Sequence, residues 1–162
     1  MSEPLTAGIT RDRAFELLNE HNKDPFHITH GETVEGTMRY FAREFDPENE
    51  EFWGIVGLLH DLDWEEHEDD PMNHTVYAAE ILEGEGATRA YPCHPDAHVR
   101  FQLFAAQARA ADGKILFACD ELTGLIGAAI IMRPSKSVMD FTTKSLKKKF
   151  RTSALPPAAR AM

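Results

Sequence analysis

The sequence has few cysteines, few basic residues and no long apolar run, and each of these shortages excludes a class of protein. There are two cysteines in 162 residues, too few for a disulfide framework, so we expect a reducing, cytoplasmic environment. Lys and Arg number 17 against 27 Asp and Glu, which gives a net charge of −10. A general nucleic-acid binder needs a basic face for its phosphate contacts, so we expect no stable nucleic-acid binding.

Long uninterrupted apolar runs are also missing. The longest candidate, residues 115–132, is broken by Asp120, Glu121 and glycines, so it predicts a buried helix and not a membrane span. No signal peptide is recognisable, and we expect no membrane association. The sequence shows neither internal repeats nor strand-like alternation of useful length. With 43% hydrophobic residues, it predicts one all-α domain with a proper core.

Helical periodicity and capping residues place the expected elements. The candidate N-caps are Thr10, Thr29, Asp46, Asp70 and Asp112. The predicted helices span residues 11–21, 30–45, 47–59, 71 to 84 or 86, 97–110, 114–132 and 138–150. The apolar stripe expected to be buried on the second helix is Val34, Met38, Phe41 and Phe45. We assign residues 1–9 to a flexible leader, 10–150 to the domain and 151–162 to a disordered tail.

The stretch 57–65 has the strongest chemical signal. An apolar helical run, Phe52 to Leu59, ends in the adjacent residues His60 and Asp61. Sequence neighbours can share one ion only where a helix is ending, because positions i and i+1 lie on different helix faces. Imidazole nitrogen with carboxylate oxygen suits Mn, Fe, Co, Ni or Zn better than Ca. We therefore expect one or two divalent ions here, with Mg as a further option.

Other helices supply further donors that face inward. His30 lies one turn before Val34 on the apolar stripe, and Asp120 is a carboxylate in the middle of an apolar helix. A lone buried carboxylate is costly unless it is paired or metal-bound. His74 and His94 extend this pattern to one donor group per helical segment. By contrast, His21 and His27 are expected at the surface, and most of the acidic run 63–70 is expected to be a solvated loop.

This order of histidines and aspartates resembles the HD-domain superfamily of metal-dependent phosphohydrolases. Four phrases are similar to one bacterial branch of HD hydrolases: HxxxVEGTMRYFA (30–42), FWGIVGLLHDLDWE (52–65), DELTGLIGA (120–128) and RPSKS (133–137). The likeness covers about residues 13–150. It departs at Pro95, where the branch has a glycine after the histidine, and in the tail, where the branch continues into another helix.

The resemblance implies a helical fold that holds a metal through His30, His60, Asp61 and Asp120. Two-metal members of the superfamily include symmetrical dinucleoside-polyphosphate hydrolases and cyclic-dinucleotide phosphodiesterases. In these, two more histidines hold the second ion, and His74 and His94 match them by order. The expected substrate is a small phosphorylated molecule, such as a nucleotide, attacked by a metal-activated water.

Further roles follow from the same chemistry. Asp61 can bridge two ions, and Asp63 or Glu65 can orient the leaving group or support the ligands, with at least one of the two at the surface. Lys136 and Lys144 resemble basic positions of the branch and are expected to hold a phosphate. The lysines expected to form only a solvated face are Lys147, Lys148 and Lys149.

Several alternatives stay open at this point, among them the oligomeric state. A non-catalytic HD-fold binding or signalling module with a structural metal is one, although retention of all six donor positions favours an enzyme. A di-iron oxygenase is another. Cys93 and Cys119 each precede a proposed ligand and invite a zinc–cysteine site. Neither belongs to a CxxC pair, so small buried hydrophobes are the better account.

Overall fold

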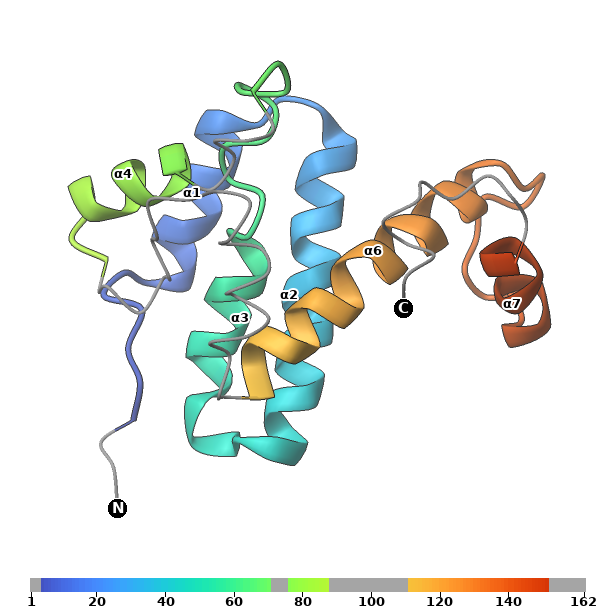
Figure 1. Cartoon of the computed structure of the whole chain (residues 1–162), viewed down its shortest axis with the longest axis horizontal. Helices are drawn as coiled ribbons and strands as arrows, with labels where there is room; N and C mark the ends of the chain where they lie inside the picture. Colours follow the sequence, from blue (N-terminus) through green and yellow to red (C-terminus); the bar gives the residue numbers. More distant parts are fainter. Residues whose placement is uncertain (1–3, 71–75, 88–110, 152–162) are drawn as a thin grey trace. The chain divides into compact units, whose positions relative to one another are not determined.

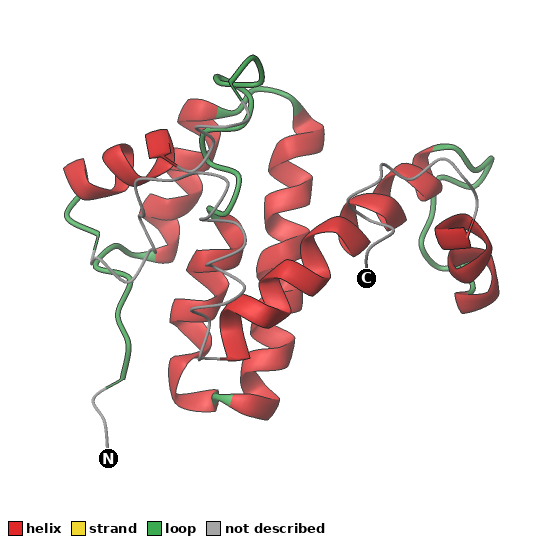
Figure 2. Ribbon diagram, in the orientation of Figure 1, coloured by secondary structure: helices red, strands yellow, loops and turns green. Residues whose placement is uncertain are grey.

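The computed structural model describes residues 4–70, 76–87 and 111–151, and every regular element in these ranges is helical (Figures 1 and 2). This confirms the all-α prediction. None of the described helices is long and apolar enough to cross a membrane. The elements, in chain order, are α1 (Arg11–His21), α2 (Pro25–Phe45), the 3₁₀ turn η1 (Pro47–Asn49), α3 (Glu50–Leu58), α4 (Val76–Gly84), α6 (Ala111–Ile131) and α7 (Thr143–Arg151).

The chain forms two compact units, with residues 1–117 in unit 1 and residues 118–162 in unit 2. The division falls inside α6. The predicted domain span of 10–150 stays a prediction, and residues 152–162 of the expected tail lie outside the described residues. Within the expected leader, Ala7 is buried in the core of unit 1.

The core of unit 1 is built where α2 packs along α3, which run side by side in Figure 1. Every residue of α3 from Phe52 to Leu58 is buried, as is Leu59. Two glycines permit the close approach of the helices. A Cβ at Gly57 would lie 2.8 Å from Met38 Cγ and 3.1 Å from the backbone of Val34, and a Cβ at Gly31 would lie 2.9 Å from the Leu58 carbonyl oxygen.

The starts of α2 and α6 and one residue of the expected core stripe differ from the sequence prediction. Helix α2 begins at Pro25, not after Thr29, because the side chain of Asp24 accepts from the Phe26 N–H and proline suits the first helical position. Asp112 is a helical residue of α6 and not its cap. Of the expected stripe, Val34 and Met38 are buried, but Phe45 is exposed, because α2 runs past the core at its C-terminal end.

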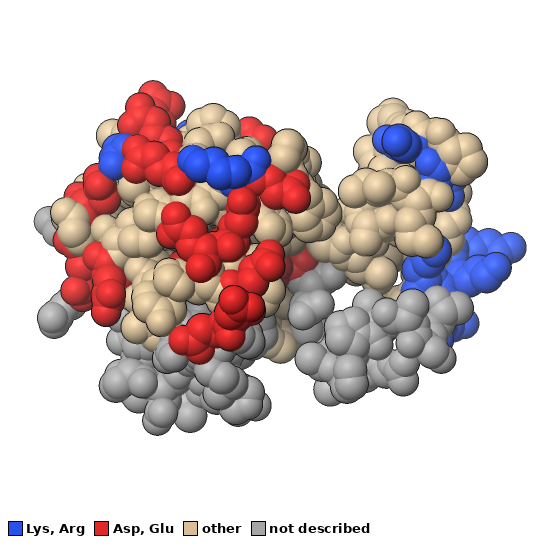
Figure 3. All heavy atoms as spheres, turned by 90° about the horizontal axis from the view of Figure 1, so that it is seen from above, with Lys and Arg blue, Asp and Glu red and all other residues tan. Residues whose placement is uncertain are grey.

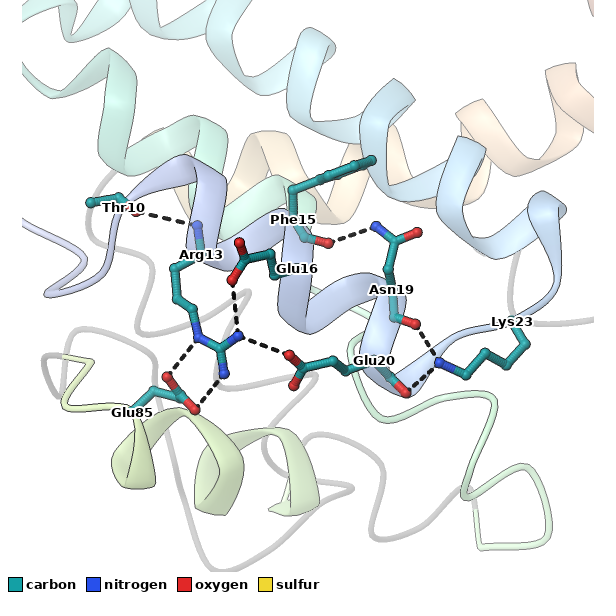
Figure 4. Close-up of polar contacts among 8 residues, drawn as sticks. All are labelled: Thr10, Arg13, Phe15, Glu16, Asn19, Glu20, Lys23 and Glu85. Carbon is teal, nitrogen blue, oxygen red and sulfur yellow. Dashed lines mark hydrogen bonds and ion pairs between the residues drawn. The ribbon is translucent and has the colours of Figure 1, made fainter.

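Charged networks join the helices of unit 1. Figure 4 shows Arg13 of α1 bonded to both carboxylate oxygens of Glu85, at 2.8 and 2.9 Å, just beyond the end of α4. A partly buried network joins α1 to α2, where Glu35 accepts from Arg11 at 2.9 Å and from Arg39 at 3.0 Å. Burial alone would raise the pKa of Glu35, but the two guanidinium groups outweigh it and lower that pKa.

The C-terminus of α4 ends in a Schellman motif. The Ala87 N–H donates to the Leu82 carbonyl at 2.9 Å, and the Gly86 N–H donates to the Glu83 carbonyl at 3.1 Å. Gly86 has a φ of 78°, the left-handed conformation that this motif requires and that glycine adopts at least cost. The predicted glycine stop of this helix is therefore confirmed.

Unit 2 contains the rest of α6, the turn 132–142 and α7. Arg133 donates to Asp140 Oδ2 at 2.8 Å and so braces the turn. Helix α7 begins at Thr143 and not at Val138, because residues 138–142 form this turn. None of the α7 residues is buried. In Figure 3 its Lys and Arg side chains gather on unit 2, whereas the face of unit 1 that is shown is rich in Asp and Glu.

Candidate metal centre

Three of the predicted ligands converge in unit 1. His30 comes from α2, and His60 and Asp61 follow the end of α3. The Asp61 Oδ2 atom lies 3.3 Å from His60 Nε2 and 3.8 Å from His30 Nε2, and the three ligand atoms lie within 4.8 Å of one another. The side chains of His60 and His30 are 7% and 13% exposed, whereas that of Asp61 is 32% exposed. The group is therefore mostly enclosed by protein but open to solvent on the Asp61 side.

The end of α3 explains how the side chains of His60 and Asp61, which are neighbours in sequence, can approach each other. Leu59 leaves the helical conformation, and residues 60–66 form a series of turns. His60 is held by a 2.8 Å hydrogen bond between its Nδ1 and the Gly57 carbonyl. A carbonyl can only accept, so Nδ1 is the donor and Nε2 is the atom left for Asp61 and a cation. This is the support that metal-binding histidines commonly have from a backbone carbonyl.

The corrected start of α2 changes the setting of His30. His30 lies in the second turn of α2, and its ring is nearly parallel to that of Phe26, with ring centroids 6.3 Å apart. The His30 and His60 rings meet at 61° with centroids 5.1 Å apart. The prediction that His30 faces inward is confirmed, but its aromatic neighbour was not anticipated.

Asp120, the fourth predicted ligand, belongs to unit 2. It lies in the middle of α6 and is half-buried, and its backbone carbonyl accepts a 2.9 Å hydrogen bond from the Thr123 hydroxyl. The relative positions of the two units are not determined, so its part in the metal centre stays a prediction. The neighbouring Cys119 is buried, and burial together with the charge of Asp120 raises the pKa of its thiol. This agrees with the sequence prediction that Cys119 is a small buried residue and not a zinc ligand.

The predicted ligands of a second ion and the predicted phosphate-binding lysines fall outside the described residues or outside unit 1. His74, His94 and Cys93 lie outside the described residues, so the second-ion prediction is untested. Lys136 and Lys144 are exposed in unit 2. Lys136 has a φ of 45°, in the left-handed region, at the turn after α6.

Asp63 has a specific structural contact. It is fully buried, and its Oδ2 accepts from the Ala78 N–H at 3.2 Å, in the first turn of α4. A carboxylate at a helix N-terminus satisfies a backbone donor and interacts favourably with the helix dipole. The bond ties the loop that contains Asp61 to α4. The predicted catalytic role of Asp63 stays a prediction.

The acidic loop is anchored more firmly than the sequence indicated. A single oxygen of Glu65 accepts from the Lys23 and Asp24 N–H groups at 2.8 and 3.0 Å and lies 3.0 Å from His27 Nδ1. The Asp24 N–H and then His27 hold the pKa of Glu65 below its ordinary value of 4.5. Glu66 likewise lies 2.9 Å from His21 Nδ1.

These contacts correct two predictions. His21 and His27 are partly buried partners of this loop and not simply surface histidines. The acidic run is only in part the solvated loop that the sequence predicted: Asp63 is buried and Glu65 is half-buried, whereas Glu66, Glu68 and Asp69 are exposed. The sequence signal that could have identified these contacts is a pair of histidines at the connection between α1 and α2, His21 and His27, together with the acidic loop that follows α3.

The chemistry of the converging atoms fits a divalent transition metal. Two imidazole nitrogens and one carboxylate oxygen make a mixed donor set of the kind that Mn, Fe, Co, Ni and Zn accept. The distances between the atoms allow one ion to contact all three after small side-chain movements. No family model, curated protein or solved structure matches the chain.

Proposed function

We propose that the protein is a metal-dependent phosphohydrolase of the HD type that acts on a small phosphorylated molecule. The observation that supports this most is the bond from His60 Nδ1 to the Gly57 carbonyl, which directs Nε2 toward Asp61. A buried histidine with only a packing role does not require a second imidazole and a carboxylate beside its Nε2 atom. The ligands we propose are His30, His60, Asp61 and Asp120.

The inclusion of Asp120 rests on the continuity of α6. Leu116 belongs to the buried core of unit 1, and the helix runs unbroken from Ala111 to Ile131. Asp120 follows Leu116 by four residues, so the two side chains share one helix face. A carboxylate on that face, one turn beyond a core leucine, is well suited to be the fourth ligand.

The exposure of Asp61 favours catalysis over a structural metal. The four proposed ligands would leave positions open on a six-coordinate ion such as Mn or Fe, and the solvent-exposed side of Asp61 is where water or a phosphate oxygen could reach them. When bound, a divalent ion would lower the pKa of a coordinated water and offset charge on a phosphoryl group. The part of the protein is to hold the ligands: the Gly57 carbonyl fixes His60, and Asp63 holds the loop that contains Asp61.

The basic residues of unit 2 are proposed to assist with the phosphate. Unit 1 is rich in carboxylates, which repel an anionic substrate, so a source of positive charge is useful. Lys136 and Lys144 are exposed. Asp140, the carboxylate of the turn between α6 and α7, pairs with Arg133. Replacing both lysines with alanine should raise KM for a phosphorylated substrate and leave metal content unchanged.

The function is tested by metal analysis of anaerobically purified protein, followed by a panel of phosphate esters and anhydrides with Mn, Co, Fe and Mg. We expect bound or restorable transition metal and hydrolysis that is lost in Asp61→Asn. His21→Ala is the matched control, because His21 also faces a carboxylate but lies outside the ligand group. Metal binding without turnover of any substrate would favour the binding module. Metal-dependent oxygen consumption would favour the oxygenase.

A further inference from the structure

Phe26 is an exposed aromatic residue beside the proposed metal centre. It lies in the first turn of α2, one turn before His30, and 41% of it is exposed. Its ring is parallel to the His30 imidazole within 4°, with centroids 6.3 Å apart. Its other ring neighbour is His27, at 5.8 Å and an interplanar angle of 68°.

The ring is held in this position by its surroundings. The Phe26 N–H donates to Asp24 Oδ1 at 2.8 Å, which fixes the start of α2. His27, against the edge of the ring, is held by Glu65 at 3.0 Å. Phe26 and His30 are four residues apart on one helix face, where aromatic pairs stabilise each other. A ligand that stacks on Phe26 would therefore meet a ring that is already ordered, which lowers the entropic cost of binding.

An ordered aromatic ring at the edge of a polar site is suited to bind a planar group. Aromatic side chains stack on nucleobases with little preference among bases, since every base has a π-face. The charge of unit 1 makes such a contact more useful. Its shown surface is rich in Asp and Glu (Figure 3), so an anionic ligand gains little from long-range attraction, and stacking supplies affinity that does not depend on charge.

We propose that Phe26 is a specificity-determining residue that stacks on an aromatic ring of the substrate, whose simplest form is a nucleoside monophosphate. The proposal rests on the proposed function, because it places the phosphate at His30, His60 and Asp61. In such a nucleotide the sugar separates the phosphate from the base. If the phosphate binds at the ligand group, the base therefore lies beside that group and not in it. Phe26 occupies such a position, next to His30.

The test compares AMP and UMP with ribose 5-phosphate, which has the same sugar and phosphate but no base. The variants are Phe26→Leu, which removes the aromatic ring, and Phe26→Trp, which retains one. Phe45→Leu is the matched control. Phe45 also lies on α2, is 57% exposed and stacks on an aromatic four residues away, Phe41, at 6.2 Å. It lies about 28 Å along the helix from Phe26, at about 1.5 Å per residue.

We expect Phe26→Leu to raise KM for both nucleotides about five- to tenfold, the lower end of the loss for one stacked base, because leucine keeps part of the apolar contact. KM for ribose 5-phosphate, kcat and Mn²⁺ affinity should stay unchanged, and Phe26→Trp and Phe45→Leu should behave as the unmodified protein. An equal rise in KM for all three compounds, or a loss of Mn²⁺ affinity, would show that Phe26 acts by positioning His30. No change in Phe26→Leu would also overturn the proposal.

Binding measurements separate this proposal from the proposed function. Calorimetry with Mn²⁺-loaded protein reports the affinity for AMP and ribose 5-phosphate whether or not either is hydrolysed. If AMP binds more tightly than ribose 5-phosphate, if this difference is lost only in Phe26→Leu and if neither compound is hydrolysed, the stacking role of Phe26 is supported and the proposed hydrolase function is refuted. If the unmodified protein hydrolyses ribose 5-phosphate and AMP with equal KM, the proposed hydrolase function is supported and the stacking role of Phe26 is refuted.

Discussion

Two pairs of histidines in unit 1 face carboxylates of the same loop but in different ways. His30 and His60 both approach one carboxylate, Asp61, and are largely buried. His21 and His27 each face a separate carboxylate, Glu66 and Glu65, and are more exposed. Two imidazole nitrogens close to one carboxylate oxygen form a donor set that one cation can contact, whereas one histidine beside one carboxylate is an ordinary ion pair or hydrogen bond. The first pair is therefore suited to bind a metal and the second to position the loop.

Removal of a ligand should have the largest effect. In His60→Ala, Mn²⁺ affinity should fall by more than about 100-fold, because even the loss of an outer contact to a ligand costs about 10- to 100-fold. Calorimetric titration of Mn²⁺ gives the affinity, and circular dichroism checks that the variant is folded. The matched variant His21→Ala should bind Mn²⁺ as before. Equal losses in both variants would contradict the assignment of the two pairs to different roles.

The packing beneath the ligand pair gives a second prediction. A Cβ at Gly57 would meet Met38 Cγ at 2.8 Å and the Val34 backbone at 3.1 Å, so Gly57→Ala should force α3 away from α2. We expect a loss of about 1–3 kcal/mol in the free energy of unfolding, measured by urea denaturation. Mn²⁺ affinity should fall too, because the Gly57 carbonyl holds His60.

Gly36 provides the control for this substitution. It lies in α2, and a Cβ there would have nothing within 4 Å. Gly36→Ala should stabilise the protein by about 0.5–1 kcal/mol, since alanine is the better helix former. A Gly57→Ala variant as stable as Gly36→Ala would show that the two helices have room to separate without cost.

The all-α fold and the proximity of His30 to His60 and Asp61 could be predicted because much of their signal is local. The cap at Thr10, the apolar run before His60 and the apolar stripe that follows His30 are visible in short stretches of sequence. The anchors of the loop could not be predicted, since they join residues far apart in the sequence. Asp63 accepts from Ala78, 15 positions away, Asn22 Nδ2 donates to the Leu62 carbonyl at 3.0 Å, 40 positions away, and Glu65 accepts from Lys23, 42 positions away. The start of α2 was misplaced because Thr29 and Asp24 are both acceptable caps, and only tertiary packing decides between them.

Loss of the central anchor should have an intermediate effect. Glu65→Gln keeps the shape of the side chain but weakens its bonds to two backbone N–H groups and to His27. We expect Mn²⁺ affinity to fall about tenfold, the lower end of the range for contacts outside the ligands. Unchanged affinity would mean that the position of Asp61 does not depend on this anchor.

The same residue sets a pH dependence of stability. The pKa of Glu65 is lower in the folded protein than its ordinary value of 4.5. Its contribution to stability is therefore fully present above pH 4.5 and is lost as the pH falls through the lower, folded value. Urea denaturation of the unmodified protein and of Glu65→Gln across this range should converge as the pH falls.

The smallest effect is expected at His21 and Glu66, the more exposed of the two histidine–glutamate pairs that hold the loop. The Glu66 side chain is 46% exposed, so solvent screens the interaction, and exposed pairs contribute at most about 1 kcal/mol. Glu66→Gln should lower the free energy of unfolding by less than about 0.5 kcal/mol and leave Mn²⁺ affinity unchanged, because Glu65 next to it still holds Lys23, Asp24 and His27. Calorimetry and urea denaturation measure both quantities. If Glu66→Gln weakened Mn²⁺ binding as much as Glu65→Gln does, the loop would be held by both acids together, and the position of Asp61 would depend on the whole loop and not on one residue.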